Sequence, residues 1–231
     1  MILRAADPIR SLIAYQKLNV KICGTYAGLS DSYDGASHHA IADMAFMRAI
    51  PNMTVISVSD AVETELATKA IAEFVGPVYL RLSRAAVPTI YDETYKFEIG
   101  KGVQLTEGKD VTIVATGYMV HKALEASESL KAKGIQARVV NIHTIKPIDK
   151  ELLISCAKET GAIVTVEEHN IYGGLGSAVA EVLSGSQPVP IEAVGIQDTF
   201  TESGDYELLL KKYGLSAENI ISKVEKVIKR K

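Results

Sequence analysis

One polar loop gathers the side chains best suited to acid–base and hydrogen-bonding chemistry. Residues 25–43, TYAGLSDSYDGASHHAIAD, contain a carboxylate at Asp34 and adjacent imidazoles at His38 and His39. The loop follows the apolar residues 20–24, which we expect to form a buried strand. Because ligands of parallel α/β sheets bind beyond the carboxyl ends of the strands, the sequence predicts a binding site in this loop.

The spacing of Asp34 and His38 supports two interpretations from the residues alone. Gly35 permits a sharp turn that brings both side chains to one pocket. Alternatively, Asp34 caps a helix that begins near His38, and both histidines are solvated.

A second candidate is Arg84, which follows an expected strand at residues 77–82. A guanidinium at the end of a strand is suited to bind a phosphate or a carboxylate. The alternative is a surface arginine that ties down a loop. Arg81 points to the other face of the strand, and we expect it to be structural.

The glycine-rich turn at residues 173–176 also follows a strand and opens a helix. Such turns can bind anions, but Glu167 and Glu168 stand just before this one and disfavour phosphate. We therefore expect this turn to serve strand-to-helix packing. His121 and His143 stand alone, and we expect them to be structural as well.

The composition is that of an ordinary globular protein: 47% of the 231 residues are hydrophobic and 23% are charged. With 25 basic and 28 acidic residues, the net charge of −3 and the lack of a basic stripe argue against nucleic acid binding. Cys23 and Cys156 have no metal-ligand spacing and suit reduced thiols. The sequence has no run of about 18 apolar residues and no signal peptide, so we expect a cytoplasmic protein without membrane contact.

Short β-branched runs alternate with helical stretches, a pattern typical of parallel sheets. The predicted fold is α/β, with two three-layer domains and mostly parallel sheets, residues 1–90 and 91–231, joined near residues 88–98. The first domain has only about three strands, fewer than usual, so we expect it to be incomplete at its N-terminus. The expected strands are residues 20–24, 54–58, 77–82, 111–115, 137–142, 162–167 and 191–194; the expected helices are residues 5–16, 39–49, 61–74, 120–133, 149–160, 175–183 and those after residue 205.

Longer segments resemble the C-terminal section of transketolase. AADPIRSLIAYQKLNVKICGTYAGLS, DGASHHAIADMAFMRAIPNM and YLRLSRAAVP are similar to the latter part of the pyrimidine-binding domain of that family. GKDVTIVATGYMVHKALEA, NIHTIKPID and TVEEHNIYGGLGSAVAEVL are similar to its C-terminal domain. The resemblance covers nearly the whole chain.

The resemblance implies a thiamine-diphosphate enzyme that transfers a two-carbon ketol unit between sugar phosphates. By position, Asp34 and His38 match the substrate pair of the family; His38 would also assist proton transfer. Arg84 matches the arginine that binds the substrate phosphate. Tyr26 stands where the family usually has a histidine, and a tyrosine cannot become cationic near neutral pH.

The resemblance also implies that part of the site lies elsewhere. The catalytic glutamate of the family falls upstream of this sequence, and the aromatic residue that stacks on the cofactor falls at about Met1. The domain that holds the diphosphate and magnesium has no counterpart here. We therefore expect an N-terminal transketolase subunit or domain as partner, a homodimer, and no activity of this chain alone, which would be a fragment or a truncated homologue.

Three alternatives remain. Deoxyxylulose-phosphate synthase shares an A-G-x loop and a D-G-x-T-H segment, while a 2-oxoacid dehydrogenase E1 β subunit shares the domain plan and the glycine-rich turn. A non-catalytic assembly module is the third.

Overall fold

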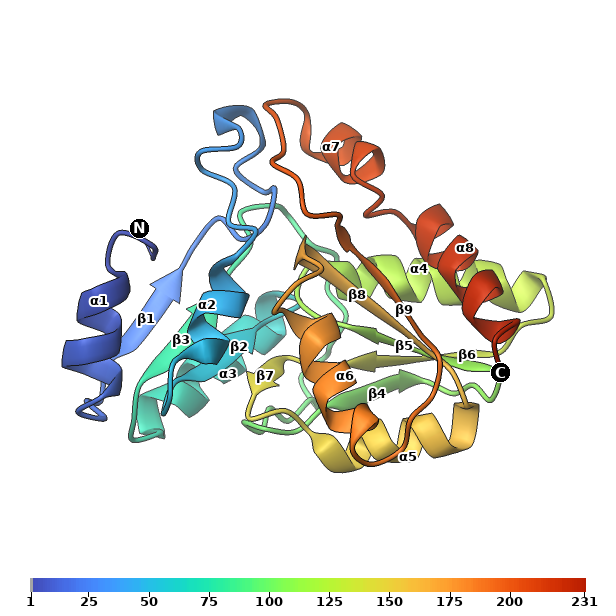
Figure 1. Cartoon of the computed structure of the whole chain (residues 1–231), viewed down its shortest axis with the longest axis horizontal. Helices are drawn as coiled ribbons and strands as arrows, with labels where there is room; N and C mark the ends of the chain where they lie inside the picture. The colour runs from blue at the N-terminus through green and yellow to red at the C-terminus, as the bar shows by residue number, and fades with distance from the viewer. Residues whose placement is uncertain (1) are drawn as a thin grey trace.

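The computed structural model describes residues 2–231 and consists of two sheets flanked by helices (Figure 1). Met1, the position expected to match the stacking aromatic residue, lies outside the described residues. The two sheets lie next to each other, and the site loop (residues 25–42) rises above the junction between them. The segment that leads into the C-terminal helices runs beside this loop.

The first sheet has four strands in the order β1-β3-β2-β7. The strands β1 (Lys21–Gly24), β3 (Val78–Arg81) and β2 (Thr54–Ser57) are parallel, whereas β7 (Thr144–Lys146) pairs with β2 in the antiparallel direction. Its helices are α1 (Ala6–Pro8), which continues as the π-helix η1 (Ile9–Ala14), α2 (Asp43–Ala49) and α3 (Ala61–Glu73).

The second sheet has five strands in the order β4-β6-β5-β8-β9, and only β4 is antiparallel to its neighbour. Helices α4 and α8 cover one face, and α5 and α6 cover the other (Figure 1). The strands are β4 (Val103–Thr106), β5 (Val111–Ala115), β6 (Ala137–Asn141), β8 (Ile163–Asn170) and β9 (Ile191–Ile196); the helices are α4 (Met119–Ala132), α5 (Lys150–Thr160), α6 (Leu175–Ser184), α7 (Tyr206–Lys212) and α8 (Ala217–Ile228).

Local sequence signals explain where several helices begin. The side chains of Asp60, Asp149, Asp205 and Ser216 each accept a hydrogen bond from a backbone N–H in the first turn of the helix that follows. Such caps satisfy donors that would otherwise lack a partner. Gly161 ends α5 in the left-handed conformation, which glycine adopts at little cost.

Most of the predicted elements are confirmed, and two strands, β4 and β7, were not predicted. The prediction of a helix from residue 39 was wrong at its start, because α2 begins only at Asp43. The residue before α2 is Ala42, and no side chain caps the helix. The interpretation of Asp34 as a helix cap is therefore also wrong.

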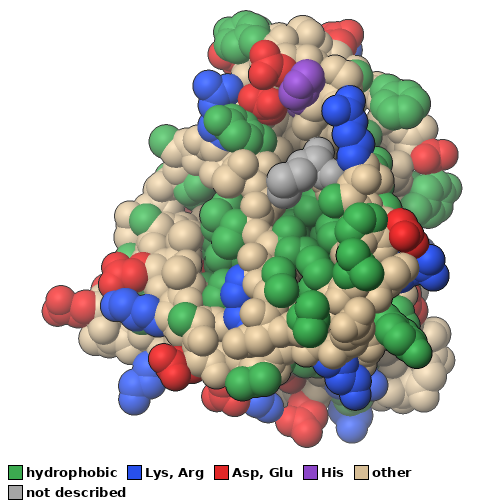
Figure 2. All heavy atoms as spheres, turned by 90° about the vertical axis from the view of Figure 1, so that its left-hand side faces the viewer, with side chains coloured by type: hydrophobic (Ala, Val, Ile, Leu, Met, Phe, Trp, Pro, Cys, Tyr) green, Lys and Arg blue, Asp and Glu red, His purple; other side chains and the backbone are tan. Residues whose placement is uncertain are grey.

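Strand β1 has a neighbour on one side only and forms an edge of the first sheet. Figure 2 faces this end of the molecule and shows hydrophobic side chains gathered on it. Leu3, Leu12, Tyr15 and Leu18, which precede β1, are among the large hydrophobic side chains that are exposed. Separately, none of the helices in residues 2–231 is long and apolar enough to span a membrane.

Candidate functional site

A cavity of about 570 Å³ opens beyond the carboxyl end of β1, at the site loop. The loop contributes Tyr26, Asp31 and His38 to its lining, and Asp43 at the start of α2 lies deeper. Phe200, from the segment between β9 and α7, forms another part of the wall although its side chain is 82% exposed. The cavity is thus lined by the first sheet's loop, by residues 2–4 near the N-terminus and by the segment between β9 and α7.

Tyr26 has an unusual backbone conformation, with φ at +61°. A non-glycine residue in the left-handed region is uncommon and is found preferentially at functional sites. Its side chain is partly exposed and lines the cavity. The chain therefore accepts a local strain that aims this ring at the cavity.

Arg84 stands beside the cavity with most of its side chain in solvent. Its guanidinium carbon lies 5.2 Å from the centre of the Tyr26 ring, within the range of a cation–π interaction. Nη1 donates to Oδ1 of Asp31 at 3.1 Å, and the backbone N–H donates to Oγ of Ser30 at 3.2 Å. The ring and the carboxylate together hold a cation at this position.

His38 and Asp34 lie in different surroundings. His38 is exposed, lines the cavity, and has Nδ1 3.0 Å from Oγ of Ser37. Asp34 is exposed at the end of the short 3-10 helix η2 (Ser32–Asp34) and is not part of the cavity lining. Of the four predicted site residues, Tyr26 and His38 share the cavity, Arg84 reaches it through Tyr26 and Asp31, and Asp34 stays outside.

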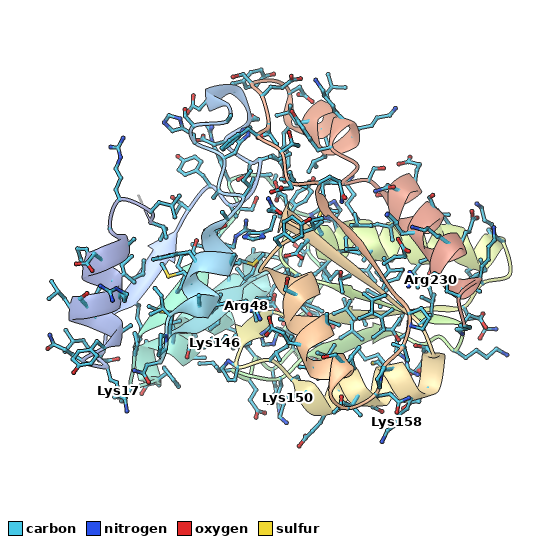
Figure 3. The ribbon with its side chains drawn as sticks, viewed as in Figure 1. Lys17, Arg48, Lys146, Lys150, Lys158 and Arg230 are labelled. Atoms are coloured by element: carbon cyan, nitrogen blue, oxygen red, sulfur yellow. The ribbon has the colours of Figure 1, made fainter. Side chains whose placement is uncertain are left out.

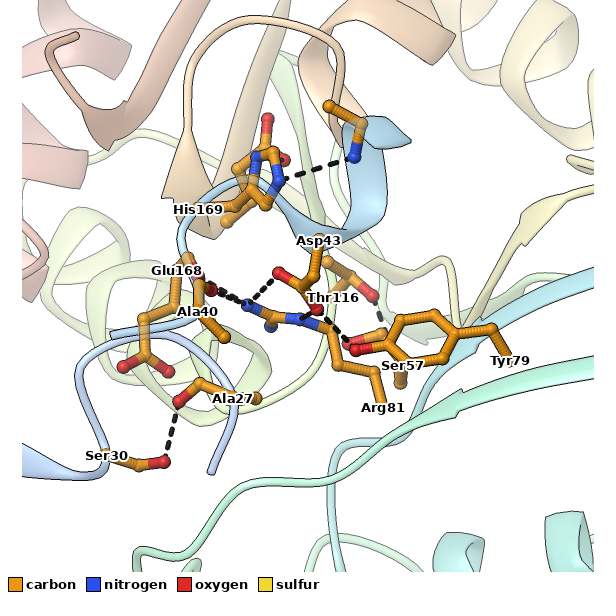
Figure 4. Close-up of polar contacts among 12 residues, drawn as sticks. Ala27, Ser30, Ala40, Asp43, Ser57, Tyr79, Arg81, Thr116, Glu168 and His169 are labelled. Atoms are coloured by element: carbon orange, nitrogen blue, oxygen red, sulfur yellow. Dashed lines mark hydrogen bonds and ion pairs between the residues drawn. The ribbon is translucent and has the colours of Figure 1, made fainter. Parts of the chain in front are cut away.

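A buried ion pair forms the base of the cavity (Figure 4). Asp43 accepts from Nε of Arg81 at 2.7 Å and from the Tyr79 hydroxyl at 2.6 Å. Burial opposes ionisation of Asp43, but the Arg81 guanidinium, together with His169 and the Tyr79 hydroxyl, holds the pKa of the carboxyl below its usual value. Arg81 also donates to the carbonyl oxygens of Ala40 and Glu168, at 2.9 and 3.0 Å, so the expected structural role of Arg81 is confirmed.

Two consecutive carboxylates on β8 are buried on opposite sides of the strand. Burial raises the pKa of Glu167 and of Glu168 to about 7. Glu167 accepts from the N–H groups of Leu175 and Gly176, at 2.7 and 2.8 Å, where α6 begins. The glycine-rich turn thus serves strand-to-helix packing, as predicted.

A second cavity of similar volume lies between α5 and α6, near Arg48, Lys146 and Lys150 (Figure 3). Two of its cations are already engaged. Nζ of Lys146 donates to the carbonyl oxygens of Arg48 and Ile50, while Arg48 pairs with Glu181 and with the carbonyl of Gly173. The predicted site residues Tyr26 and His38 line the cavity at the site loop instead.

Sequence reasoning missed Asp31, Glu168 and Phe200. Asp31 lies in the same polar loop as Asp34, so its carboxylate could have been considered with the others. Phe200 comes from a segment more than 150 residues later, and nothing in its local sequence points to the cavity. Within residues 2–231, no group of three or more His, Cys, Asp or Glu side chains could hold a metal ion.

The sequence matches two families along its length. Residues 1–89 match the family "Transketolase, pyrimidine binding domain", and residues 100–220 match "Transketolase, C-terminal domain".

Individual relatives agree with these matches. The chain is 48% identical to a Methanocaldococcus jannaschii protein named as a transketolase C-terminal section, over 98% of this chain and 72% of the relative. It is 42% identical to a 6-deoxy-6-sulfo-D-fructose transketolase subunit of a Clostridium species, over 99% of this chain and 71% of the relative.

A solved structure described as a split gene transketolase, inactive beta4 tetramer, is 50% identical and superposes with a TM-score of 0.91. The superposition covers 99% of this chain and 72% of that one. The expected α/β fold with two mostly parallel sheets is confirmed by this match. On its sequence and its fold, the chain belongs to the transketolase family and corresponds to its C-terminal section.

Proposed function

We propose that this chain is the C-terminal subunit, or section, of a transketolase that transfers a two-carbon ketol unit between sugar phosphates. The observation that carries the proposal is the arrangement around the cavity. Tyr26, Asp31 and His38 supply hydrogen-bonding groups, and Arg84 supplies a cation beside them. A sugar phosphate requires this combination of neutral or acidic partners for hydroxyls and a guanidinium for the phosphate.

Within this proposal, His38 hydrogen-bonds the sugar near the reacting carbons and assists proton transfer. Its exposure beside the cavity and its contact with Ser37 support this role, since the ring is free to approach a ligand. Arg84 binds the phosphate and Tyr26 orients Arg84. Asp34 binds a donor hydroxyl only if the turn at residues 32–34 moves toward the cavity, since its carboxylate does not line it.

The transketolase family generally uses thiamine diphosphate, which makes a carbonyl carbon of the donor sugar nucleophilic. The described residues do not fit the diphosphate end of this cofactor, because they offer no cluster of magnesium ligands. We propose that a partner subunit or domain holds the cofactor and its magnesium. In this proposal, the isolated chain does not catalyse transfer.

The proposed assembly contains an N-terminal transketolase subunit or domain and at least two copies of this chain. A related structure is described as an inactive tetramer of β chains, which supports both self-association and dependence on a partner. The edge strand β1 and the exposed hydrophobic side chains before it are typical of an interaction surface. Residues 1–90 would then belong to the pyrimidine-binding domain and residues 91–231 to the C-terminal domain.

The test is co-purification of this chain with a candidate N-terminal subunit, followed by an assay of two-carbon transfer from a ketose phosphate to an aldose phosphate. We expect transfer only when both chains, thiamine diphosphate and magnesium are present. Transfer by this chain alone would refute the dependence on a partner. A purified complex that decarboxylates a 2-oxoacid, but does not transfer a ketol unit, would refute the transketolase activity.

A further inference from the structure

The second sheet contacts the site loop through a buried carboxylate. The backbone N–H of Leu29 donates to Oε1 of Glu168 at 2.6 Å, and both residues are buried. Figure 4 shows Glu168 beside Ala27 and Ser30, the residues of the loop that flank this contact. Glu168 lies on β8 and does not line the cavity, so it contacts the loop from behind.

The approach of Glu168 to the loop is close enough to require a glycine. A Cβ atom placed on Gly28 would lie 2.2 Å from Cδ of Glu168, and Gly28 has φ at +59°. The loop backbone and the carboxyl group are therefore fitted to one another, and no other residue type fits between them.

A second contact secures the other end of the loop. Nδ1 of His39 lies 2.5 Å from Oγ1 of Thr201, both side chains are buried, and burial lowers the pKa of His39. The N–H of Gly204 donates to the carbonyl oxygen of Ser32 at 3.3 Å, which adds a backbone contact from the same segment. Residues 201–204, in the segment between β9 and α7, thus hold the second end of the loop.

The two contacts lie on either side of the part of the loop that carries Asp31 and His38. We propose that Glu168 and Thr201 are positioning residues, through which the C-terminal domain fixes the site loop in the shape that binds a phosphorylated sugar. Neither residue touches the sugar; each acts by holding the backbone and the rings that do. This inference rests on the proposed function for the identity of the ligand, but the positioning itself can be measured without it.

The direct test is hydrogen–deuterium exchange of the full chain, followed by mass spectrometry of peptides from residues 25–42. Glu168→Ala leaves the Leu29 N–H without an acceptor, and we expect at least tenfold faster exchange in these peptides. Glu168→Gln keeps a carbonyl oxygen at Oε1 and should restore slow exchange. Thr201→Val keeps the side-chain volume but removes the hydroxyl, and it should accelerate hydrogen exchange in the same peptides.

Glu192→Ala is the matched control, because Glu192 is a buried carboxylate on β9 that pairs with Lys223, Lys226 and Arg230 instead of the loop. This variant should leave the exchange rate of residues 25–42 unchanged. If Glu168→Ala does not fold, Thr201→Val decides the test by itself. Two outcomes would overturn the proposal. One is an unchanged exchange rate of residues 25–42 in Thr201→Val; the other is exchange in Glu168→Gln that is as fast as in Glu168→Ala.

A kinetic readout then separates positioning from general structure. In the assembly with the cofactor-binding partner, Glu168→Ala should raise the KM for a pentose phosphate about tenfold with kcat changed less than about threefold, and Glu168→Gln should restore KM. A tenfold fall in kcat with an unchanged KM would contradict positioning of the sugar. If the wild-type assembly transfers no ketol unit, the proposed function fails, while the exchange data still decide whether the two residues hold the loop.

Discussion

The guanidinium carbon of Arg84 lies 5.2 Å from the centre of the Tyr26 ring, beside the cavity that the ring helps to line. The two residues come from loops that follow neighbouring parallel strands, β3 and β1. Their contact therefore follows from the topology of the sheet, which places both strand ends at one edge. Together with the hydrogen bond to Asp31, the contact sets the direction of the Arg84 side chain.

We predict that Arg84→Ala lowers kcat/KM for phosphorylated substrates far more than for unphosphorylated ones. In the active assembly, kcat/KM for a sugar phosphate should fall about 100-fold, because a charge-assisted contact contributes roughly 2–3 kcal/mol. The value for an unphosphorylated analogue should change less than about threefold. Lys69→Ala is the matched control, since Lys69 pairs with exposed Glu65 on α3 and does not line the cavity. An equal loss with both kinds of substrate would remove Arg84 from the phosphate site.

Replacing Tyr26 with histidine should make phosphate binding depend on pH. An imidazole with an ordinary pKa of about 6.5 is cationic at pH 5.5 and neutral at pH 8, so the KM of Tyr26→His for a sugar phosphate should be lower at pH 5.5. Tyr26→Phe keeps the aromatic face for Arg84 and adds no charge, so it should follow the wild-type pH profile. The measurement is KM between pH 5.5 and 8; coincident profiles for the two variants would contradict the placement of Tyr26 beside the phosphate.

Arg81→Met should destabilise the fold by about 3–5 kcal/mol, because it leaves the buried Asp43 carboxylate without its cation. Urea unfolding monitored by circular dichroism gives the free energy of unfolding. The control, Arg10→Met, breaks an exposed pair and should be indistinguishable from wild type in this assay. If Arg81→Met loses no stability, the ion pair at the base of the cavity does not stabilise the fold.

The free energy of unfolding should fall as the pH rises through the range in which Glu168 is protonated in the folded state but ionised in the unfolded state. Burial raises the pKa of Glu168 from an ordinary 4.5 to about 7 in the fold, against the lowering effect of Arg81. Asp43, Tyr118 and Tyr206 also face this carboxyl group. Between these two pKa values the folded chain binds the proton and the unfolded chain does not, so stability is lost with rising pH.

Glu168→Gln removes this titration while it keeps the acceptor for Leu29. The free energy of unfolding of the variant, relative to wild type, should therefore increase from pH 4.5 to pH 7 by up to about 3 kcal/mol and stay constant above pH 7.5. Denaturant unfolding at several pH values measures the difference. A difference that is independent of pH would show that Glu168 is ionised in the fold throughout this range.

The sequence was sufficient for most elements because their signals are local. Short apolar runs rich in β-branched residues predict β5 and β8, and Asp149 and Gly161 mark the two ends of α5. Strands β4 and β7 were not predicted. Strand β4 has no buried run of apolar residues, β7 has only three residues, and each pairs in the antiparallel direction with a distant strand.

The site was predicted in part for the same reason. Tyr26 and His38 belong to one loop, and Arg84 follows the neighbouring strand, so the parallel topology brings them together. Asp34 was predicted from its spacing to His38 and from the family resemblance, and the turn at residues 32–34 leaves its side chain outside the cavity lining. Glu168 and Thr201 could not be predicted, because their contacts depend on how the second sheet packs against the first.

Strand β7 is supplied by residues 144–146, yet it completes the sheet that residues 21–81 begin. A ribosome adding about 5–20 residues per second needs on the order of ten seconds to pass from β2 to β7. During that time the first sheet of the nascent chain lacks β7, and the edge of β2 that pairs with it is open. A gene fragment cut after residue 100 would keep that edge open permanently. The two halves of the chain are therefore expected to be inherited, and engineered, as one piece.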